Sequence, residues 1–297
     1  MKRLSNSLTR RGMLAGTAAG LAAAAMPTAH TTALAATQDN AEGPVIVNKR
    51  IRQSVCMWCF GGVSLERMCV EAKRMGYESI ELLNEPEIRK VKEHGLTCAI
   101  VNSHGINNGL NRTENHEQCL EAIRKAIDIA VKYECPNVIT FSGNRGGMPD
   151  DVGLANCAEA LAKITPYAEE KQVTIIMELL NSKVDHKDYM FDNIAWGVEL
   201  CKRVKSDRFK LLYDIYHAQV NEGDVIRSIR NYHQYIGHYH TAGNPGRNEI
   251  DDTQELYYPA IMREIVKTGY TGFVGQEFLP RRDALKSLAE AAKICDV

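Results

Sequence analysis

Four segments of the chain share one pattern, a short apolar run that ends on a single acid or histidine. The segments are VTIIMELLN, FKLLYDIYH, YIGHYHTAG and GFVGQEFLP, and their polar residues are Glu178, Asp214, His240 and Glu277. An apolar run bounded by turn residues is typical of a strand that is buried on both faces of a parallel sheet. In each segment the polar residue stands five positions after the predicted strand begins, so we expect the four side chains at about one level.

Strand-like runs and helical patterns alternate along the rest of the chain. The other predicted strands are 51–57, 77–83, 96–101 and 137–141, and the predicted helices are 65–75, 86–94, 114–133, 151–171, 193–204, 225–232, 258–268 and 283–294. Eight strand–helix pairs over about 250 residues are typical of a (β/α)8 TIM barrel. The alternative is a doubly wound open sheet, but no glycine-rich dinucleotide turn follows the first strand. The sequence therefore predicts a single-domain α/β barrel over residues 49–297.

The amino-terminal 36 residues have a different character. Arg10 and Arg11 precede an Ala/Gly-rich run over 15–25, and residues 33–35 read Ala-Leu-Ala, a small-residue cleavage site. This pattern is typical of a twin-arginine signal peptide. The apolar run is shorter than the roughly 20 residues that a bilayer requires, so we expect no stable membrane anchor. The sequence predicts a signal peptide and cleavage region over 1–36, a polar linker over 37–48, and a periplasmic or secreted protein exported by the twin-arginine route.

The composition is that of an ordinary globular chain, with 44% hydrophobic residues and a net charge of -1. No basic surplus or Lys/Arg cluster occurs in the body of the protein, so we expect no nucleic-acid partner. The nine cysteines are an odd number, and we expect mostly buried free thiols rather than a disulfide framework. The segment from Cys56 to Cys59 is a CxxC, but a single CxxC is a weak zinc signal. We expect it to pack at a strand end.

The four polar strand ends predict a metal site when they are taken together. Each residue alone has an ordinary structural explanation: Asp214 can cap the turn that follows it, and His238 competes with His240 on the same face of its strand. One histidine and three carboxylates at a common level nevertheless favour a divalent metal, and a ligand set rich in oxygen indicates Mn²⁺ or Mg²⁺.

Such a site suits the chemistry of hydroxy-carbonyl compounds. Moving a carbonyl along a polyol, or inverting a carbon beside it, requires removal of a weakly acidic C–H proton. A metal can stabilise the resulting enediolate, and a carboxylate on each side can take and return the proton. The side chains predicted to shape the pocket suit a polyhydroxylated ligand, and they are Trp58, Phe60, His104, Asn107 and Asn108.

Several stretches resemble those of a known family. They are QSVCMWC from Gln53, LYDIYHAQ from Leu212, EGD from Glu222, IGH from Ile236, PGRNE from Pro245 and GQE from Gly275. On these stretches the whole barrel resembles the xylose isomerase-like barrels, and within them the hydroxypyruvate isomerase group.

The resemblance implies roles for individual residues. It implies a divalent metal held by Glu178, Asp214, His240 and Glu277, with the two glutamates also moving protons. It further implies that His217 and Arg247 bind substrate oxygens, with help from Glu249. A histidine at position 240 is the residue that the related ketose epimerases carry, whereas hydroxypyruvate isomerases tend to carry glutamine there. Barrels of this kind often pair, so a homodimer is one expected assembly.

The sequence thus predicts a metal-dependent isomerase that interconverts a hydroxypyruvate-type keto-acid or a ketose through an enediolate. The expected partner is therefore a small sugar or keto-acid, with His104 among the groups that bind it. Two alternatives on the same site stay open, a ketose 3-epimerase and a keto-polyol dehydratase. A third alternative is a periplasmic sugar-binding protein without turnover, although binding alone does not require two glutamates at a metal.

Overall fold

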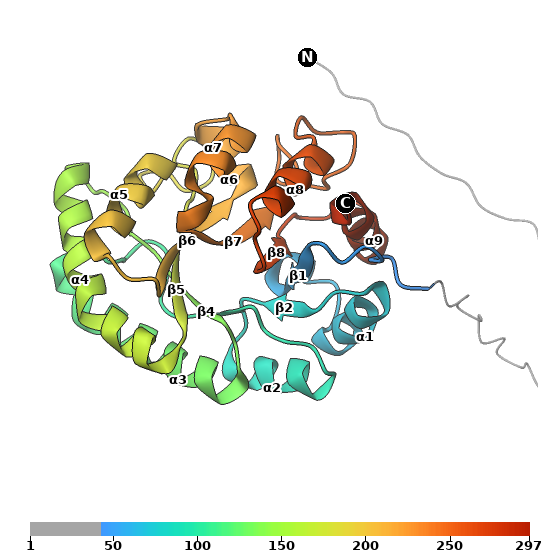
Figure 1. Ribbon diagram of the computed structural model, residues 1–297, viewed down its shortest axis with the longest axis horizontal. Coiled ribbons are helices and arrows are strands. Elements are labelled where there is room, and N and C mark those ends of the chain that lie inside the picture. Colours follow the sequence, from blue (N-terminus) through green and yellow to red (C-terminus); the bar gives the residue numbers. More distant parts are fainter. Residues whose placement is uncertain (1–42) are drawn as a thin grey trace, which may run out of the picture. The chain divides into compact units, whose positions relative to one another are not determined.

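The computed structural model describes residues 43–297, so the predicted signal peptide and the first half of the predicted linker lie outside the described residues. Strands and helices alternate, with the strands gathered in the middle and the helices around them (Figure 1). The strands are β1 (Arg52–Cys56), β2 (Ser79–Glu81), β3 (Ile100–Val101), β4 (Asn137–Thr140), β5 (Thr174–Glu178), β6 (Phe209–Asp214), β7 (Ile236–Thr241) and β8 (Phe273–Gln276). The helices are α1 (Leu65–Met75), α2 (Glu85–Glu93), α3 (His116–Tyr133), α4 (Asp150–Lys171), α5 (Ile194–Val204), α6 (Ile215–Asn221), α7 (Val225–Tyr232), α8 (Tyr258–Lys267) and α9 (Ala284–Cys295).

The strands form one parallel sheet that is nearly closed. Its order is β2-β1-β8-β7-β6-β5-β4-β3, which places the first and the last strands of the chain side by side. The remaining gap, between β2 and β3, is spanned by two isolated parallel bridges, Ser79 to Thr97 and Leu83 to Val101. The prediction of a (β/α)8 barrel is confirmed.

Local sequence signals set the helix boundaries. The Asn84 side chain accepts a hydrogen bond from the backbone N–H of Glu87, and the Glu87 side chain accepts one from the backbone N–H of Asn84, which forms a capping box at the start of α2. At the end of α1, Gly76 adopts a left-handed conformation with φ of 100°. That conformation favours glycine, and a Cβ at this position would also lie 3.1 Å from the Cβ of Ile46.

One helix was not predicted. The sequence reads Asp214 to Asp224 as a polar strand end and a turn, whereas the structure forms α6 there. The reason lies in Asp214 itself, whose Oδ1 accepts a hydrogen bond from the backbone N–H of His217 at 2.8 Å and so caps the first turn of α6. The capping role weighed for Asp214 is therefore real, and it occupies only one of the two carboxylate oxygens.

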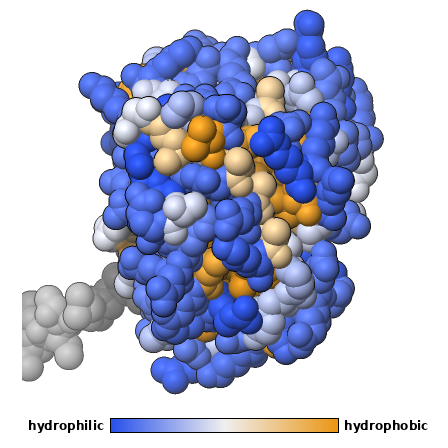
Figure 2. Space-filling view, turned by 90° about the vertical axis from the view of Figure 1, so that its left-hand side faces the viewer, coloured by the Kyte–Doolittle hydropathy of each residue, from blue (hydrophilic) through white to orange (hydrophobic). Residues whose placement is uncertain are grey.

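Buried side chains fill the barrel and the layer between the sheet and the helices. The nine cysteines are free and buried, in agreement with the expectation of buried thiols. Figure 2 shows the side of the barrel on which α4 lies, where hydrophilic residues cover most of the face and apolar residues are exposed in separate patches. Within residues 43–297, no helix combines the length and the apolarity needed to cross a membrane.

Candidate metal centre

The structure brings together the four polar residues that end the apolar segments. Glu178 is the last residue of β5, Asp214 the last of β6, His240 lies in β7, and Glu277 follows β8. All four side chains are buried, and one ligand atom from each lies within 4.8 Å of the others. The strand register explains this arrangement, because Asp214 pairs with His240 across β6 and β7, and His240 pairs with Gly275, two residues before Glu277.

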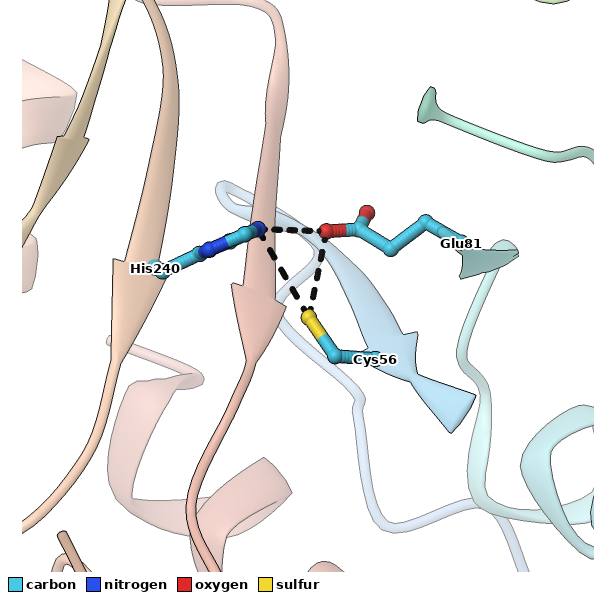
Figure 3. Close-up of side chains that lie close together, drawn as sticks. All are labelled: Cys56, Glu81 and His240. Atoms are coloured by element: carbon cyan, nitrogen blue, oxygen red, sulfur yellow. Dashed lines mark hydrogen bonds and ion pairs between the residues drawn. The ribbon is translucent and has the colours of Figure 1, made fainter. Parts of the chain in front are cut away.

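His240 lies at the centre of the cluster and uses both ring nitrogens. Its Nδ1 is 3.2 Å from Glu178 Oε1 and 3.0 Å from Glu277 Oε2. Its Nε2 faces the opposite way, 2.8 Å from Glu81 Oε1 and 3.6 Å from Cys56 Sγ (Figure 3). The competing His238 does not join the four ligands but contacts Glu81, with 3.0 Å between Nε2 and Oε1.

Burial and neighbouring charges shift the pKa values of all four side chains in the cluster. Burial, and then the charge of Glu277, raises the pKa of Asp214 well above its ordinary value and also raises the pKa of Glu178. Burial works against ionisation of Glu277 as well, but His240 and Arg247 outweigh it and lower the pKa of Glu277. Burial alone would lower the pKa of His240, whereas Cys56 and Glu277 raise it.

These donors fit a divalent cation. Three of the four side chains offer oxygen, the donor that Mn²⁺ and Mg²⁺ prefer. In the part of the chain that the structure describes, Asp214 Oδ2 is buried and has no hydrogen-bond partner. A buried carboxylate oxygen without a partner costs free energy, and a bound cation would remove that cost.

Arg247 reaches the cluster from the loop after β7. Gly246 and Arg247 both have left-handed backbone, with φ of 97° and 57°. The Arg247 guanidinium donates from Nη2 to Glu277 Oε2 at 2.7 Å and lies 4.0 Å from Asp214 Oδ2. It also lies over the ring of Trp58, 5.1 Å from the ring centroid. The side chain is therefore a partly buried cation beside the carboxylates, where it can contact an oxygen of a substrate.

His217 lies in α6 with its ring beside Asp214. Its Nδ1 accepts a hydrogen bond from the backbone N–H of Asn181 at 3.1 Å, and its Nε2 lies 3.9 Å from Asp214 Oδ2. Burial, and then the charge of Arg247, holds the pKa of His217 well below its ordinary value, so the ring is neutral. Because Nδ1 is the acceptor, the hydrogen of the neutral ring is on Nε2, and that donor points towards the cluster.

Two predicted substrate ligands are not part of the cluster. Glu249 Oε1 accepts hydrogen bonds from the backbone N–H of Arg281 at 2.9 Å and from the hydroxyl of Ser287 at 2.9 Å. It therefore fixes the segment after β8, and the geometry gives no support to a substrate-binding role. His104 has both ring nitrogens in contact with protein groups, Nε2 with Thr140 Oγ1 at 2.8 Å and Nδ1 with the Gly105 carbonyl at 3.0 Å. These loop side chains turn towards local partners that the sequence pattern does not reveal.

A cavity of about 430 Å³ opens beside the cluster. Its lining residues are Trp58, Leu82, Asn102, Ile106, Ile139, Phe141, Glu178, Leu180, His186, Arg247 and Glu277. The wall near β2 to β4 is mainly apolar, and the charged side chains come from β5 and from the segments after β7 and β8. The predicted pocket residue Trp58 lies in this wall and donates from Nε1 to Glu277 Oε1 at 2.9 Å, whereas Phe60 is buried against Phe278.

Sequence reasoning missed the layer beneath the ligands. Glu81 is the last residue of β2, and Asn181 follows β5, but the sequence pattern assigns neither of them a role. In the structure Glu81 contacts His240, and Asn181 contacts His217. The sequence does place Glu81 at the end of a predicted strand, which is a position where a buried acid needs a partner. In the structure it pairs with Cys56 of the neighbouring strand.

Comparisons with known proteins agree with the fold. Residues 69–295 match the family model described as the xylose isomerase-like TIM barrel. A putative hydroxypyruvate isomerase from Homo sapiens is 25% identical over 253 residues, which cover 78% of this chain and 90% of that protein. A 2-oxo-tetronate isomerase from Cupriavidus necator is 34% identical over 140 residues, which cover 46% of this chain and 53% of that protein.

Solved structures with a similar fold come from proteins with different names. A structure entitled AP endonuclease, family 2, from Brucella melitensis has a TM-score of 0.72 and 25% identity, covering 82% of this chain and 96% of that one. D-psicose 3-epimerase from Clostridium cellulolyticum, with D-tagatose, has a TM-score of 0.70 and 15% identity, covering 83% of this chain and 100% of that one. At that identity the likeness to the epimerase shows the fold alone.

Proposed function

The chain belongs to the xylose isomerase-like TIM barrel family, an isomerase and epimerase family, and on that premise we propose that it is a metal-dependent enzyme acting on a hydroxy-carbonyl compound through an enediolate. The observation that carries the proposal is the cluster of Glu178, Asp214, His240 and Glu277, whose ligand atoms lie within 4.8 Å of one another. Under this proposal the four side chains hold Mn²⁺ or Mg²⁺. When bound, the cation would supply Lewis-acid chemistry, the stabilisation of negative charge that develops on substrate oxygens.

The two glutamates are suited to different parts of the proton transfer. Glu277 is fixed by Arg247 at 2.7 Å and by Trp58 at 2.9 Å, and its lowered pKa keeps it ionised. Burial raises the pKa of Glu178, which makes its carboxylate a stronger base than an exposed glutamate. We assign removal of the C–H proton to Glu178, which keeps that proton. Glu277 is ionised at rest, so it would first take up a different proton from solvent and then deliver it to the other side of the substrate.

Arg247 and His217 are proposed to orient the substrate. Arg247 lines the cavity and contributes a fixed positive charge, and His217 directs its Nε2–H towards the cluster. Both groups donate hydrogen bonds, so both suit the carbonyl and hydroxyl oxygens of a sugar or keto-acid.

The cavity favours a ketose over hydroxypyruvate among the candidate substrates. A cavity of about 430 Å³ is far larger than a three-carbon acid requires. Arg247 is the cation in the described wall of the cavity, and it already pairs with Glu277. Apart from the proposed cation, a substrate carboxylate would therefore meet the two carboxylates that line the cavity, Glu178 and Glu277, and a shared arginine. A ketose isomerase or a ketose 3-epimerase suits this site better than an enzyme for a small anion.

Proton NMR in D₂O tests the proposal directly. The mature protein, stripped of metal and reloaded with Mg²⁺, is incubated with ketoses, keto-acids and hydroxypyruvate. We expect metal-dependent loss of the C–H signal beside the carbonyl of at least one compound, and the product then separates isomerase from epimerase. Loss of water without return of the proton would instead identify a dehydratase. Binding of a sugar with no exchange would identify a binding protein and overturn the proposal.

Metal binding is expected to release protons. Asp214, Glu178 and His240 have raised pKa values in the metal-free protein, and each must lose its proton to become a ligand. The equilibrium therefore shifts towards the metal complex as pH rises, and the apparent affinity for Mg²⁺ should increase by about tenfold or more from about pH 6 to about pH 8. Titration calorimetry in buffers of different ionisation enthalpy measures the protons released. An affinity that does not change over this range would contradict the assignment of the ligands.

A further inference from the structure

A second group of buried side chains lies on the far side of His240 from the candidate ligands. Glu81, at the end of β2, receives three contacts on one oxygen, Oε1. This oxygen is 2.8 Å from His240 Nε2, 3.0 Å from His238 Nε2 and 3.3 Å from Cys56 Sγ. Figure 3 shows Cys56, Glu81 and His240 arranged as a triangle at the ends of their strands. The side chains of all four residues are fully buried: Cys56, Glu81, His238 and His240.

The contact with Glu81 determines which nitrogen of His240 is free. A neutral imidazole carries one hydrogen, and an ionised carboxylate can only accept it. When His240 is neutral, as a metal ligand must be, the pair at 2.8 Å keeps its one hydrogen on Nε2 and leaves the lone pair of Nδ1 directed towards Glu178 and Glu277. If the hydrogen were on Nδ1, the ring could not serve as the fourth ligand.

We propose that Glu81 is a positioning residue that holds His240 with its hydrogen on Nε2, so that Nδ1 binds the metal. This inference rests on the proposed function, since it requires His240 to be a ligand. A metal-bound histidine usually donates its other N–H to a carboxylate or carbonyl, and such partners raise metal affinity.

The surrounding strands are built to keep Glu81 in place. A Cβ at Gly275 of β8 would lie 2.3 Å from Glu81 Oε1 and 2.9 Å from His240 Cδ2. The Glu81 carboxylate thus passes over a glycine to reach the imidazole, and any side chain at position 275 would displace it. His238 supports the same arrangement, because its ring stands edge-on to the ring of His240 at 5.1 Å and also contacts Glu81.

The same triangle has a second interpretation as a metal site in its own right. Cys56 Sγ, Glu81 Oε1 and His240 Nε2 lie within 3.6 Å of one another. The separation of 2.8 Å between Nε2 and Oε1 is that of a charge-assisted hydrogen bond, which favours the positioning role. The two interpretations differ in stoichiometry, because a second site would bind a second equivalent of metal and would depend on the Cys56 thiol.

The experiment compares metal binding, independent of activity, in matched variants. Glu81→Gln keeps the shape of the side chain and removes its charge. Glu81→Asp keeps the charge, but the shorter side chain places the carboxylate farther from His240. The control is Gln276→Leu, which disrupts a buried polar network between Gln276, Gln53 and Thr241 on the same sheet without touching His240. Mn²⁺ and Mg²⁺ affinities are measured by calorimetry, and ¹⁵N NMR of the Mg²⁺-loaded protein reports which nitrogen of His240 carries hydrogen.

We expect one equivalent of metal in the parent protein, hydrogen on His240 Nε2, and affinity about 10- to 100-fold weaker in both Glu81 variants. The Gln276→Leu variant should lose stability but keep the affinity. Unchanged affinity in a folded Glu81 variant would overturn the proposal, as would two equivalents of metal with the second lost in Cys56→Ser. A parent protein that binds no metal would refute the proposed function itself. If Glu81→Gln does not fold, Glu81→Asp decides the question.

Discussion

Replacing Glu178 by glutamine is expected to abolish exchange of the substrate C–H proton while leaving the barrel folded. Glutamine has the same shape as glutamate, so the packing at the end of β5 is preserved, but it cannot accept a proton at neutral pH. A positioned general base contributes about 10²- to 10⁴-fold to the rate. Glu178 is also a proposed metal ligand, so weaker metal binding should lower the rate further. We therefore expect a fall in turnover of about 10³-fold or more, measured by proton NMR in D₂O at saturating Mg²⁺.

A matched control separates this chemical effect from general disturbance. Glu222→Gln alters an exposed residue whose carboxylate accepts the backbone N–H of Ile194 at 2.8 Å, at the start of α5. That variant should lose some stability and keep its turnover. Near-full activity in Glu178→Gln would show that another group removes the proton.

Replacing Asp214 by asparagine is expected to weaken metal binding by about 100-fold or more, beyond the usual effect of residues that only support a ligand. Asparagine retains an oxygen that can accept the backbone N–H of His217, the contact that Asp214 Oδ1 makes at 2.8 Å, so the cap of α6 is preserved. The substitution removes one negative charge from the set that binds the cation. Calorimetry with Mn²⁺ measures the affinity, and turnover should fall to background at limiting metal.

The same substitution at a different helix cap provides the control. The Asp283 side chain caps α9 by accepting the backbone N–H groups of Leu285 and Lys286 at 3.1 and 2.9 Å. Asp283→Asn should leave metal affinity and turnover unchanged. If Asp214→Asn bound metal as tightly as the parent protein, Asp214 would be a helix cap and no ligand.

Under the proposed function, the charge of the metal ion would link metal binding to the proton-transfer step. Three carboxylates are buried around one histidine and one arginine, and without a cation burial raises the pKa of two of them. A bound cation favours their ionised form and so prepares Glu178 to act as a base. For this reason we expect loss of metal to remove both the charge that stabilises the enediolate and the ionised base.

The sequence by itself determined the barrel and the level of the four candidate ligands. A strand buried on both faces must be apolar along its length, so an acid or a histidine at its carboxyl end stands out from the pattern. Helical periodicity between such runs predicts alternating strands and helices. Each candidate ligand stands five positions after its predicted strand begins, which places all four at one level: Glu178, Asp214, His240 and Glu277.

Only the tertiary structure decided which polar groups meet one another. Glu81 and His240 are 159 residues apart in sequence. Their strands, β2 and β7, are separated in the sheet by β1 and β8, and the contact depends on the glycine at position 275 of β8. Glu249 and His104 lie in loops, where the direction of a side chain is set by local hydrogen bonds, and both turn to protein partners. Periodicity reports which residues are buried, because burial depends on the strand or helix itself. Contacts between strands depend on how the sheet closes, and no single segment carries that information.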